Sequence, residues 1–365
     1  MRKPAKSLGL VLLSLVGLVV LIMGAGLAYR ADRQHQNAQA LAIDAPQGID
    51  EARFVNIGGI DQWVTIRGRD RDNPVLLFLH GGPGEASNLV YYSQFIPWTK
   101  EFTVVQWDQR GAGKTFGTTG EAVGPTMTIR RMSEDGIDLA EYLRKRLHKE
   151  KIILVGHSWG SILGIWMAKM RPDLFYAFVG TGQVVNVQHN FADVYERTLE
   201  RARTVGNATA VQELRSIGPP PWRTLGALNI QGKWAQEFEG ASALTNAELA
   251  SALFAPGYTL GDLYREGGSI KLTLDRLVGD SLEGPMMRVD LRNLGPDFAL
   301  PVFIIEGPED FVTSPALAKD YVARLNAPQK EFVLLDAGGH FALFTHTTAF
   351  LRELTQRVRP LAVDR

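Results

Sequence analysis

The sequence predicts an α/β protein in which a mostly parallel sheet is flanked by helices and interrupted late in the chain by a helical insertion. Short apolar runs, typical of buried parallel strands, alternate with helical patterns over the first half of the chain. Runs of this kind stop after about Gly182 and return only near residue 301. A third observation, a long apolar segment at the N-terminus, adds a transmembrane helix to the predicted fold.

The N-terminal apolar segment covers residues 8–28 without a charged side chain. As a helix it would be roughly 30 Å long, the thickness of the hydrocarbon core of a bilayer. The apolar region of a cleaved signal peptide is shorter, about 7–15 residues, although Gly26-Leu27-Ala28 fits a cleavage site. We therefore expect residues 1–30 to anchor the chain, with secretion after cleavage as the alternative. Basic residues before the segment favour a cytoplasmic N-terminus and a catalytic domain on the extracytoplasmic side.

Charge and composition exclude several function classes. The 365 residues include 39 basic and 39 acidic side chains, and this balance gives no reason to expect a nucleic-acid partner. The chain has no cysteine, which excludes thiol catalysis, disulfides and cysteine-ligated zinc. Its 7 histidines are dispersed and form no His-Glu-x-x-His pattern, so we expect neither a metal nor another cofactor.

The remaining sequence divides into a linker, a sheet domain and a cap. We expect the linker over 31–50, the sheet domain over 51–182 and 299–365, and a helical cap over 183–298. A hairpin is predicted around Gly58-Gly59. Strands are predicted at 74–79, 102–107, 151–155, 301–306 and 331–335. Helices are predicted at about 132–147, 162–170, 193–205, 245–254 and 344–358.

The sharpest catalytic signal is Gly156-His157-Ser158-Trp159-Gly160, which lies between a predicted strand and an apolar helix. This is the context of a nucleophile elbow, in which glycines permit a tight turn and the serine projects from the edge of the sheet. The helix N-terminus behind the serine offers free N–H groups to an oxyanion. We therefore predict Ser158 as the nucleophile.

A serine nucleophile needs a base and a carboxylate to orient that base. His340 follows the last predicted strand within a glycine turn, and Asp310 follows the strand before it. The chain order Ser158, Asp310, His340 is the nucleophile–acid–base order of this kind of elbow protein. Glu309 is the nearest competitor for the acid.

The oxyanion of an acyl-transfer reaction needs at least two hydrogen-bond donors. The backbone N–H of Trp159, directly after the nucleophile, is one candidate. The loop after the first buried strand reads His80-Gly81-Gly82-Pro83-Gly84, and its glycines let the backbone approach the reacting carbonyl. We predict Gly82 as the second donor. Asp108, Gln109 and Arg110, which follow the next strand, are expected to brace the floor of the site by hydrogen bonds.

Three motifs together resemble the proline iminopeptidase branch of the α/β-hydrolase superfamily, over roughly residues 50–182 and 300–360. These motifs are His80–Gly84, Trp107-Asp108-Gln109-Arg110-Gly111-Ala112-Gly113 and Gly156–Ser161. The resemblance implies release of an N-terminal residue, often proline, through an acyl-enzyme and without a cofactor or metal. In that branch, cap glutamates within recognisable stretches hold the amino group of the substrate. The cap here contains glutamates, with Glu196 and Glu200 as our candidates for substrate binding, but none stands in those stretches.

The sequence therefore predicts a serine hydrolase that acts on a small molecule or short peptide, most like a proline iminopeptidase. An esterase or amidase for small acyl compounds, with the same triad under a different cap, is the first alternative. A membrane-tethered binding protein that keeps the fold without turnover is the second.

Overall fold

The structure, a computed structural model, describes residues 4–239 and 250–363. Within these residues one sheet has the strand order β1-β2-β4-β3-β5-β6-β7-β8. Strands β1, β2 and β4 pair antiparallel, and all other neighbours pair parallel. The strands are β1 Ile49–Ile57, β2 Ile60–Gly68, β3 Val75–Leu79, β4 Thr103–Trp107, β5 Ile152–His157, β6 Phe175–Thr181, β7 Val302–Glu306 and β8 Lys330–Leu334. The predicted mostly parallel sheet is confirmed.

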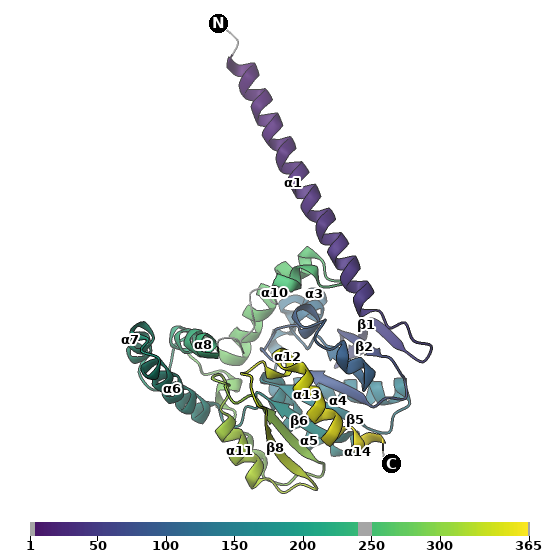
Figure 1. The fold of residues 1–365 in the computed structure, drawn as a ribbon, viewed down its shortest axis with the longest axis vertical. Coiled ribbons are helices and arrows are strands. Elements are labelled where there is room, and N and C mark those ends of the chain that lie inside the picture. Colours follow the sequence, from purple (N-terminus) through teal and green to yellow (C-terminus); the bar gives the residue numbers. More distant parts are fainter. Residues whose placement is uncertain (1–3, 240–249, 364–365) are drawn as a thin grey trace.

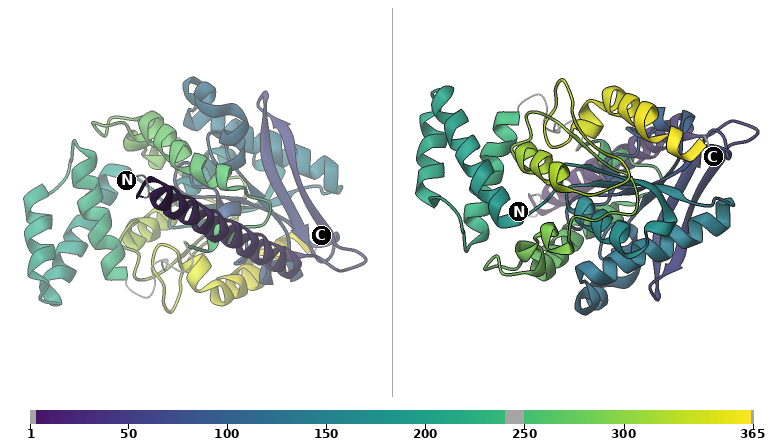
Figure 2. Two further views of the ribbon diagram at one scale, coloured as in Figure 1. Left: turned by 90° about the horizontal axis from the view of Figure 1, so that it is seen from above. Right: turned by 90° about the horizontal axis from the view of Figure 1, so that it is seen from below.

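Helices cover both faces of this sheet and also form the insertion (Figures 1 and 2). The α-helices are α1 Pro4–Leu41, α2 Ser87–Val90, α3 Gly113–Thr119, α4 Ile129–Leu147, α5 Trp159–Met170, α6 Val187–Thr204, α7 Ala208–Ile217, α8 Leu225–Glu239, α10 Leu260–Thr273, α11 Pro315–Arg324, α12 Ala342–Thr345, α13 Thr347–Glu353 and α14 Pro360–Val363. The 3₁₀ and π turns are η1 Pro97–Lys100, η2 Gly120–Thr126, η3 Pro172–Leu174, η5 Ala252–Phe254, η6 Leu274–Val278, η7 Pro285–Arg288, η8 Leu291–Leu294 and η9 Leu354–Val358.

The central strands are mostly apolar because both of their faces are covered. Every residue of β3, β4, β5 and β7 is buried. Each large side chain removed from water contributes roughly 1.5–3 kcal/mol to folding. Strand β6 was not predicted; it lies between β5 and β7 and reaches the same edge of the sheet as β5.

The helical insertion lies between β6 and β7, and α6 to α8 stand together beside the sheet (Figure 1). Helix α6 is the predicted helix 193–205, and it begins earlier because the Asn186 side chain accepts the His189 N–H and caps its first turn. Of the helix predicted at 245–254, residues 245–249 lie outside the described part of the chain, and Ala252–Phe254 forms the 3₁₀ turn η5.

Helix α1 is longer than predicted. Its apolar part is exposed, and residues Leu12–Leu41 are long and apolar enough to cross a membrane by length and composition. The helix then continues without a break to Leu41, so residues 31–41, which were expected to form a linker, are helical. Figure 1 shows α1 projecting away from the sheet domain.

The C-terminal part of α1 packs on the rest of the protein mainly through polar side chains. Arg30 and Gln34 donate to the carbonyl of Tyr258 at 2.8 Å each, and Asn37 donates to the carbonyl of Phe254 at 3.0 Å. With buried Leu41, these residues recur at steps of four, three and four and form one helix face. The segment looked like a linker because its packing face carries amides instead of apolar residues.

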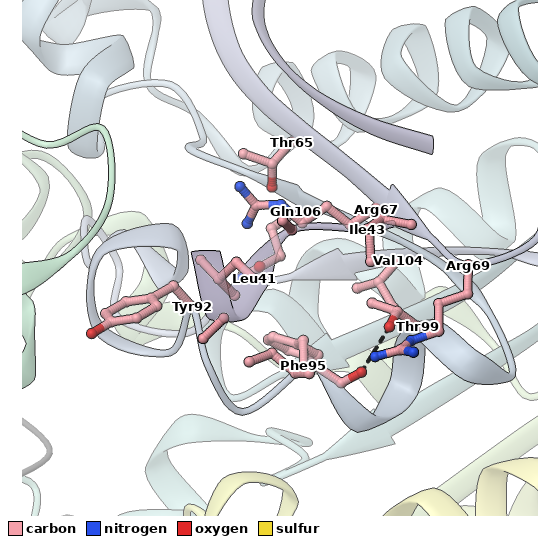
Figure 3. Close-up of a pocket in the computed structure, with 13 residues that line it drawn as sticks. Leu41, Ile43, Thr65, Arg67, Arg69, Tyr92, Phe95, Thr99, Val104 and Gln106 are labelled. Atoms are coloured by element: carbon pink, nitrogen blue, oxygen red, sulfur yellow. Dashed lines mark hydrogen bonds between the residues drawn. The ribbon is translucent and has the colours of Figure 1, made fainter. Parts of the chain in front are cut away.

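The end of α1 closes against the sheet around a small cavity of about 10 Å³ (Figure 3). Leu41 points there toward side chains of β2, β4 and the segment that contains Tyr92 and Phe95. Leu41, Tyr92 and Phe95 are all buried in one apolar cluster with Val104 of β4. The C-terminal end of the helix that carries the apolar segment is therefore packed into the core of the sheet domain.

A buried ion pair fixes the loop after β4. The Arg110 guanidinium donates twice to the Asp135 carboxylate of α4, at 2.7 and 3.0 Å, and both side chains are almost fully buried. Arg110 also donates to the carbonyl of Gly58 in the β1–β2 turn. Arg110, which was predicted to brace the floor of the site, instead ties a loop, a helix and a hairpin together.

We predict that Asp135→Ala lowers the free energy of unfolding by about 3–5 kcal/mol, because it leaves the buried Arg110 guanidinium without a charged partner. Chemical denaturation of the full chain in detergent measures this loss. Arg130→Ala, which removes an exposed ion pair with Glu134 on the same helix, is the control and should cost less than about 1 kcal/mol. Equal costs for the two variants would contradict the prediction.

Candidate active site

Ser158 occupies a strained turn between β5 and α5. Its backbone has φ +53° and ψ −119°, a conformation that residues other than glycine rarely adopt. Strain of this kind costs about 1–3 kcal/mol and is kept where the surrounding structure enforces it. Here the Ser158 N–H donates to the Thr181 carbonyl of β6 at 3.0 Å, and a Cβ on Gly160 would overlap the Leu79 carbonyl of β3.

His340 and Asp310 form a buried pair at the same edge of the sheet. The distance from His340 Nδ1 to Asp310 Oδ2 is 3.0 Å, and both residues are almost fully buried. Asp310 Oδ1 accepts the N–H groups of Val312 and Thr313, and the Thr313 hydroxyl donates to Oδ2 at 2.6 Å. The carboxylate accepts a hydrogen bond from Nδ1–H, which leaves Nε2 as the basic nitrogen of the neutral imidazole.

Two contacts place the imidazole beside the serine loop. The His157 ring, next to the nucleophile in sequence, contacts the His340 carbonyl through Nε2 at 3.0 Å. A Cβ on Gly182, which follows the hydrogen-bond partner of Ser158, would lie 2.8 Å from His340 Cε1. In the described residues no hydrogen bond joins the Ser158 hydroxyl to the His340 ring; catalytic bonds of this type often tighten only in the substrate complex.

Two backbone segments near Ser158 can donate to an oxyanion. Trp159 is the first residue of α5, where N–H groups have no acceptor within the helix. The loop after β3 lies against the serine, because a Cβ on Gly81 would be 3.2 Å from Ser158 Cβ. Gly82 follows with φ +108° and is exposed. Its role as the second donor stays a prediction.

The floor of the site is a hydrogen-bonded layer, as expected for the residues after β4. The Gln109 side chain donates to the His80 carbonyl at 3.1 Å and accepts the Trp159 indole N–H at 3.0 Å. Asp108 accepts the Tyr258 hydroxyl of the cap at 2.8 Å and the Asn88 amide at 2.9 Å. Burial raises the pKa of Asp108 to about 6 in spite of these bonds.

Two further buried carboxylates surround the pair, and the sequence analysis assigned neither of them to the site. Glu239, the last residue of α8, accepts the N–H groups of Phe311 and His340 at 3.0 and 3.2 Å. Glu306, the last residue of β7, accepts those of Gly182 and Gln183 at 2.9 and 2.8 Å. A charged residue that closes an otherwise apolar strand was the available signal for Glu306.

These charges shift one another's pKa values. Burial, followed by the nearby charge of Asp310, raises the pKa of Glu239 to about 7 and that of Glu306 to about 8. Burial lowers the pKa of His340, but Asp310, Glu239 and Glu306 outweigh it and raise the value to about 9. Burial also acts to raise the pKa of Asp310, but the interaction with His340 prevails and the pKa is lowered. The pair is therefore electrostatically favoured in its ionised form.

The structure does not bring Glu196 and Glu200 to this site. Both lie on the exposed face of α6, and Glu200 pairs with Arg203. Helix α6 turns its other face inward through Tyr195, Leu199 and their buried neighbours. That apolar spacing is visible in the sequence and would have placed both glutamates outside. The residue of α6 that reaches the pair is Arg197, which donates to the Asp310 carbonyl at 2.8 Å.

The fold and this edge of the sheet define a class of protein, and comparison with known proteins agrees. The family model for the alpha/beta hydrolase fold matches residues 74–347, so the chain belongs to the α/β-hydrolase family and is a hydrolase.

Individual relatives lie in the aminopeptidase part of that family. The chain is 28% identical to a probable aminopeptidase of Bacillus subtilis over 323 residues, which cover 87% of this chain and 99% of that protein. It is 33% identical to a probable proline iminopeptidase of Streptomyces coelicolor over 120 residues, 33% of this chain and 35% of that protein. The solved structure of proline iminopeptidase from Mycobacterium smegmatis superposes with a TM-score of 0.60 at 17% identity, covering 86% of this chain and 99% of that one.

We predict that the His340 imidazole titrates above the ordinary histidine pKa of about 6.5. Removal of one nearby negative charge by Glu239→Gln should lower its midpoint, because the imidazolium loses a stabilising partner. NMR titration of the full chain with labelled histidine measures both values. Glu237→Gln, an exposed neighbour on α8, is the control and should leave the midpoint in place. A His340 midpoint at or below 6.5 in the wild type would contradict the assignment of charges.

Proposed function

We propose that the protein is a serine hydrolase that works through an acyl-enzyme, with Ser158 as nucleophile, His340 as base and Asp310 as the carboxylate that orients the base. The observation that carries this proposal is the buried 3.0 Å pair of His340 and Asp310 beside a strained elbow serine. An ionised carboxylate on Nδ1 makes Nε2 the nitrogen that accepts a proton, which is the arrangement needed to activate an alcohol.

The reaction follows from these positions. The neutral form of His340 is the base: its Nε2 takes the hydroxyl proton as Ser158 Oγ attacks the substrate carbonyl, and Asp310 stabilises the imidazolium that forms. Because the pKa of His340 is raised to about 9, the share of this neutral form grows as the pH rises. The oxyanion accepts the N–H of Trp159 and, in this proposal, that of Gly82. His340 then returns the proton to the leaving amine or alcohol as the acyl bond breaks. A water molecule, deprotonated by the same histidine, releases the acyl group and regenerates Ser158.

The substrate class that we propose is a short peptide or amide from which an N-terminal residue is released. Its amino group is cationic, and acidic residues lie around the site: Glu239 and Glu306 near His340, and partly buried Glu85, which also interacts electrostatically with His340. Because the pKa values of Glu239 and Glu306 are raised to about 7 and 8, their attraction for a cation grows as the pH rises. The relatives described as aminopeptidase and proline iminopeptidase support the same class. The exposed positions of Glu196 and Glu200 favour the second candidate, an esterase or amidase for small acyl compounds.

We also propose that α1 anchors the protein in a membrane with the catalytic domain on the extracytoplasmic side. The apolar stretch and the docking face belong to one unbroken helix, and this continuity supports an uncleaved anchor over a removed signal. Basic residues before the stretch support the orientation.

We predict that a fluorophosphonate probe labels the wild-type chain and that Ser158→Ala abolishes the labelling, because the probe reacts only with an activated serine. Gel fluorescence after incubation with the probe measures this. Ser216→Ala, an exposed serine of α7, is the control and should be labelled like the wild type. Labelling of Ser158→Ala at the wild-type level would remove Ser158 as the nucleophile.

Parallel assays with a prolyl amide and with p-nitrophenyl acetate separate the two candidate functions. We predict turnover of the prolyl amide, with loss of that activity when the substrate amino group is acetylated, since the cation then no longer meets the acidic site. Turnover of the ester alone would replace the aminopeptidase proposal by the esterase. Activity should persist in the presence of a metal chelator.

A further inference from the structure

The apolar part of α1 ends directly beside the cap. Tyr29, the first residue after the apolar run 8–28, packs edge-to-face on Phe254 of η5, with ring centroids 5.8 Å apart. One turn further on, Gln34 donates to the carbonyls of Ala255 and Tyr258 at 2.7 and 2.8 Å. If α1 crosses a bilayer, the segment around η5 therefore lies at the level where the helix leaves the hydrocarbon. Aromatic side chains are enriched at that level in membrane proteins.

The same part of the cap exposes large apolar side chains to solvent. Leu253 of η5 is 48% exposed, and Leu260 and Tyr264 of α10 are 47% and 88% exposed. Leu260 and Tyr264 are four residues apart and therefore share one face of α10. Outside α1, the other exposed large apolar residues in the described part of the chain are Ile270, also on α10, and the scattered Phe54, Val205, Leu334 and Val363. Apolar exposure is thus concentrated beside α1.

The exposed basic side chains of α10 pair with acidic neighbours. Lys271 is exposed, lies on the same face as Leu260 and Tyr264 and pairs with Asp275, and Arg265 pairs with Asp262. The acidic Glu266 is turned inward, where it accepts the Ala86 N–H at 2.9 Å. An exposed face with leucine, tyrosine and lysine is typical of helices that lie in the surface plane of a bilayer.

We propose that the surface formed by Leu253, Leu260 and Tyr264 lies on the lipid bilayer, next to the point where α1 emerges from it. This inference rests on the proposed membrane anchor. The bilayer is the occupant because the surface is continuous with the end of the apolar helix and adjoins it through the Tyr29–Phe254 contact.

The proposal has a consequence for the site, because the inner side of α10 holds the loop that contains Gly82. The Ser269 hydroxyl donates to the carbonyls of Gly84 and Gly111 at 2.8 and 2.7 Å, and the Thr273 hydroxyl donates to that of Pro83 at 2.9 Å. A helix is only about 10–12 Å across with its side chains. In this proposal, the loop predicted to bind the oxyanion therefore lies one helix away from the lipid.

The absence of cysteine makes a direct test possible in the full chain. Single cysteines replace Tyr264, Leu253, Val205 and Val19 in turn, each carries a fluorophore, and each variant is placed in vesicles of phosphatidylcholine and phosphatidylglycerol. Val205 is the matched control, since it is 49% exposed at the end of α6 in the cap. Val19 reports whether α1 is in the bilayer. Two quenchers are compared: nitroxide attached to lipid near the headgroup, and iodide in the water.

We expect labels at 264 and 253 to lose fluorescence to the lipid nitroxide and to be shielded from iodide, with the reverse at 205. Equal iodide quenching at 264 and 205 would overturn the proposal. So would a label at 264 that is shielded from both quenchers, which would indicate a second copy of the chain on this surface. A label at 19 that the lipid nitroxide does not reach would remove the anchor and the proposal with it. Fluorophosphonate labelling of the same samples tests the hydrolase proposal separately, because these positions lie outside the triad.

Discussion

The buried pair of His340 and Asp310 constrains the loops and hydrogen-bond donors that surround it. A carboxylate taken out of water is strongly destabilised unless it is paired and hydrogen-bonded. Asp310 is therefore supplied with two backbone N–H groups, the Thr313 hydroxyl and the imidazole. The N–H groups and the hydroxyl come from the loop that follows β7, and the imidazole comes from the loop that follows β8, so both loops must keep one conformation for the pair to exist. The carboxyl edge of the parallel sheet provides that fixed base.

The cap is part of this arrangement and not only a cover over it. Glu239 at the end of α8 accepts the backbone N–H of His340, and Arg197 of α6 donates to the backbone carbonyl of Asp310. Two cap helices thus bind the main chain of both members of the pair. Since Glu239 also adds negative charge beside the imidazole, movement of α8 would change both the position and the pKa of His340. Geometry and electrostatics at this edge are coupled through one side chain.

The sequence was informative where local pattern and tertiary environment coincide. Fully buried strands are mostly apolar, and the elbow motif is contiguous in the sequence between one strand and one helix, so β3, β4, β5 and the Ser158 turn were predictable. The meeting of Asp310 and His340 followed from the shared edge of parallel strands. Glu239 could not be assigned in this way, because its partners are backbone groups that only the tertiary fold brings to the end of α8. The docking face of α1 escaped notice for a related reason: Gln34 and Asn37 bind carbonyl groups, and no apolar spacing marks such a face.

Tyr258 joins the N-terminal helix to the floor of the catalytic edge. Its carbonyl accepts from Arg30 and Gln34, and its hydroxyl donates to Asp108 in the loop that also carries Gln109. A shortened version of the protein that starts after Leu41 would retain Ser158, Asp310 and His340, yet its Tyr258 carbonyl would be left to solvent. In such a fragment the cap would be held less firmly on the sheet domain than in the intact chain. Kinetic constants measured on the fragment would therefore describe an enzyme with a more mobile cap.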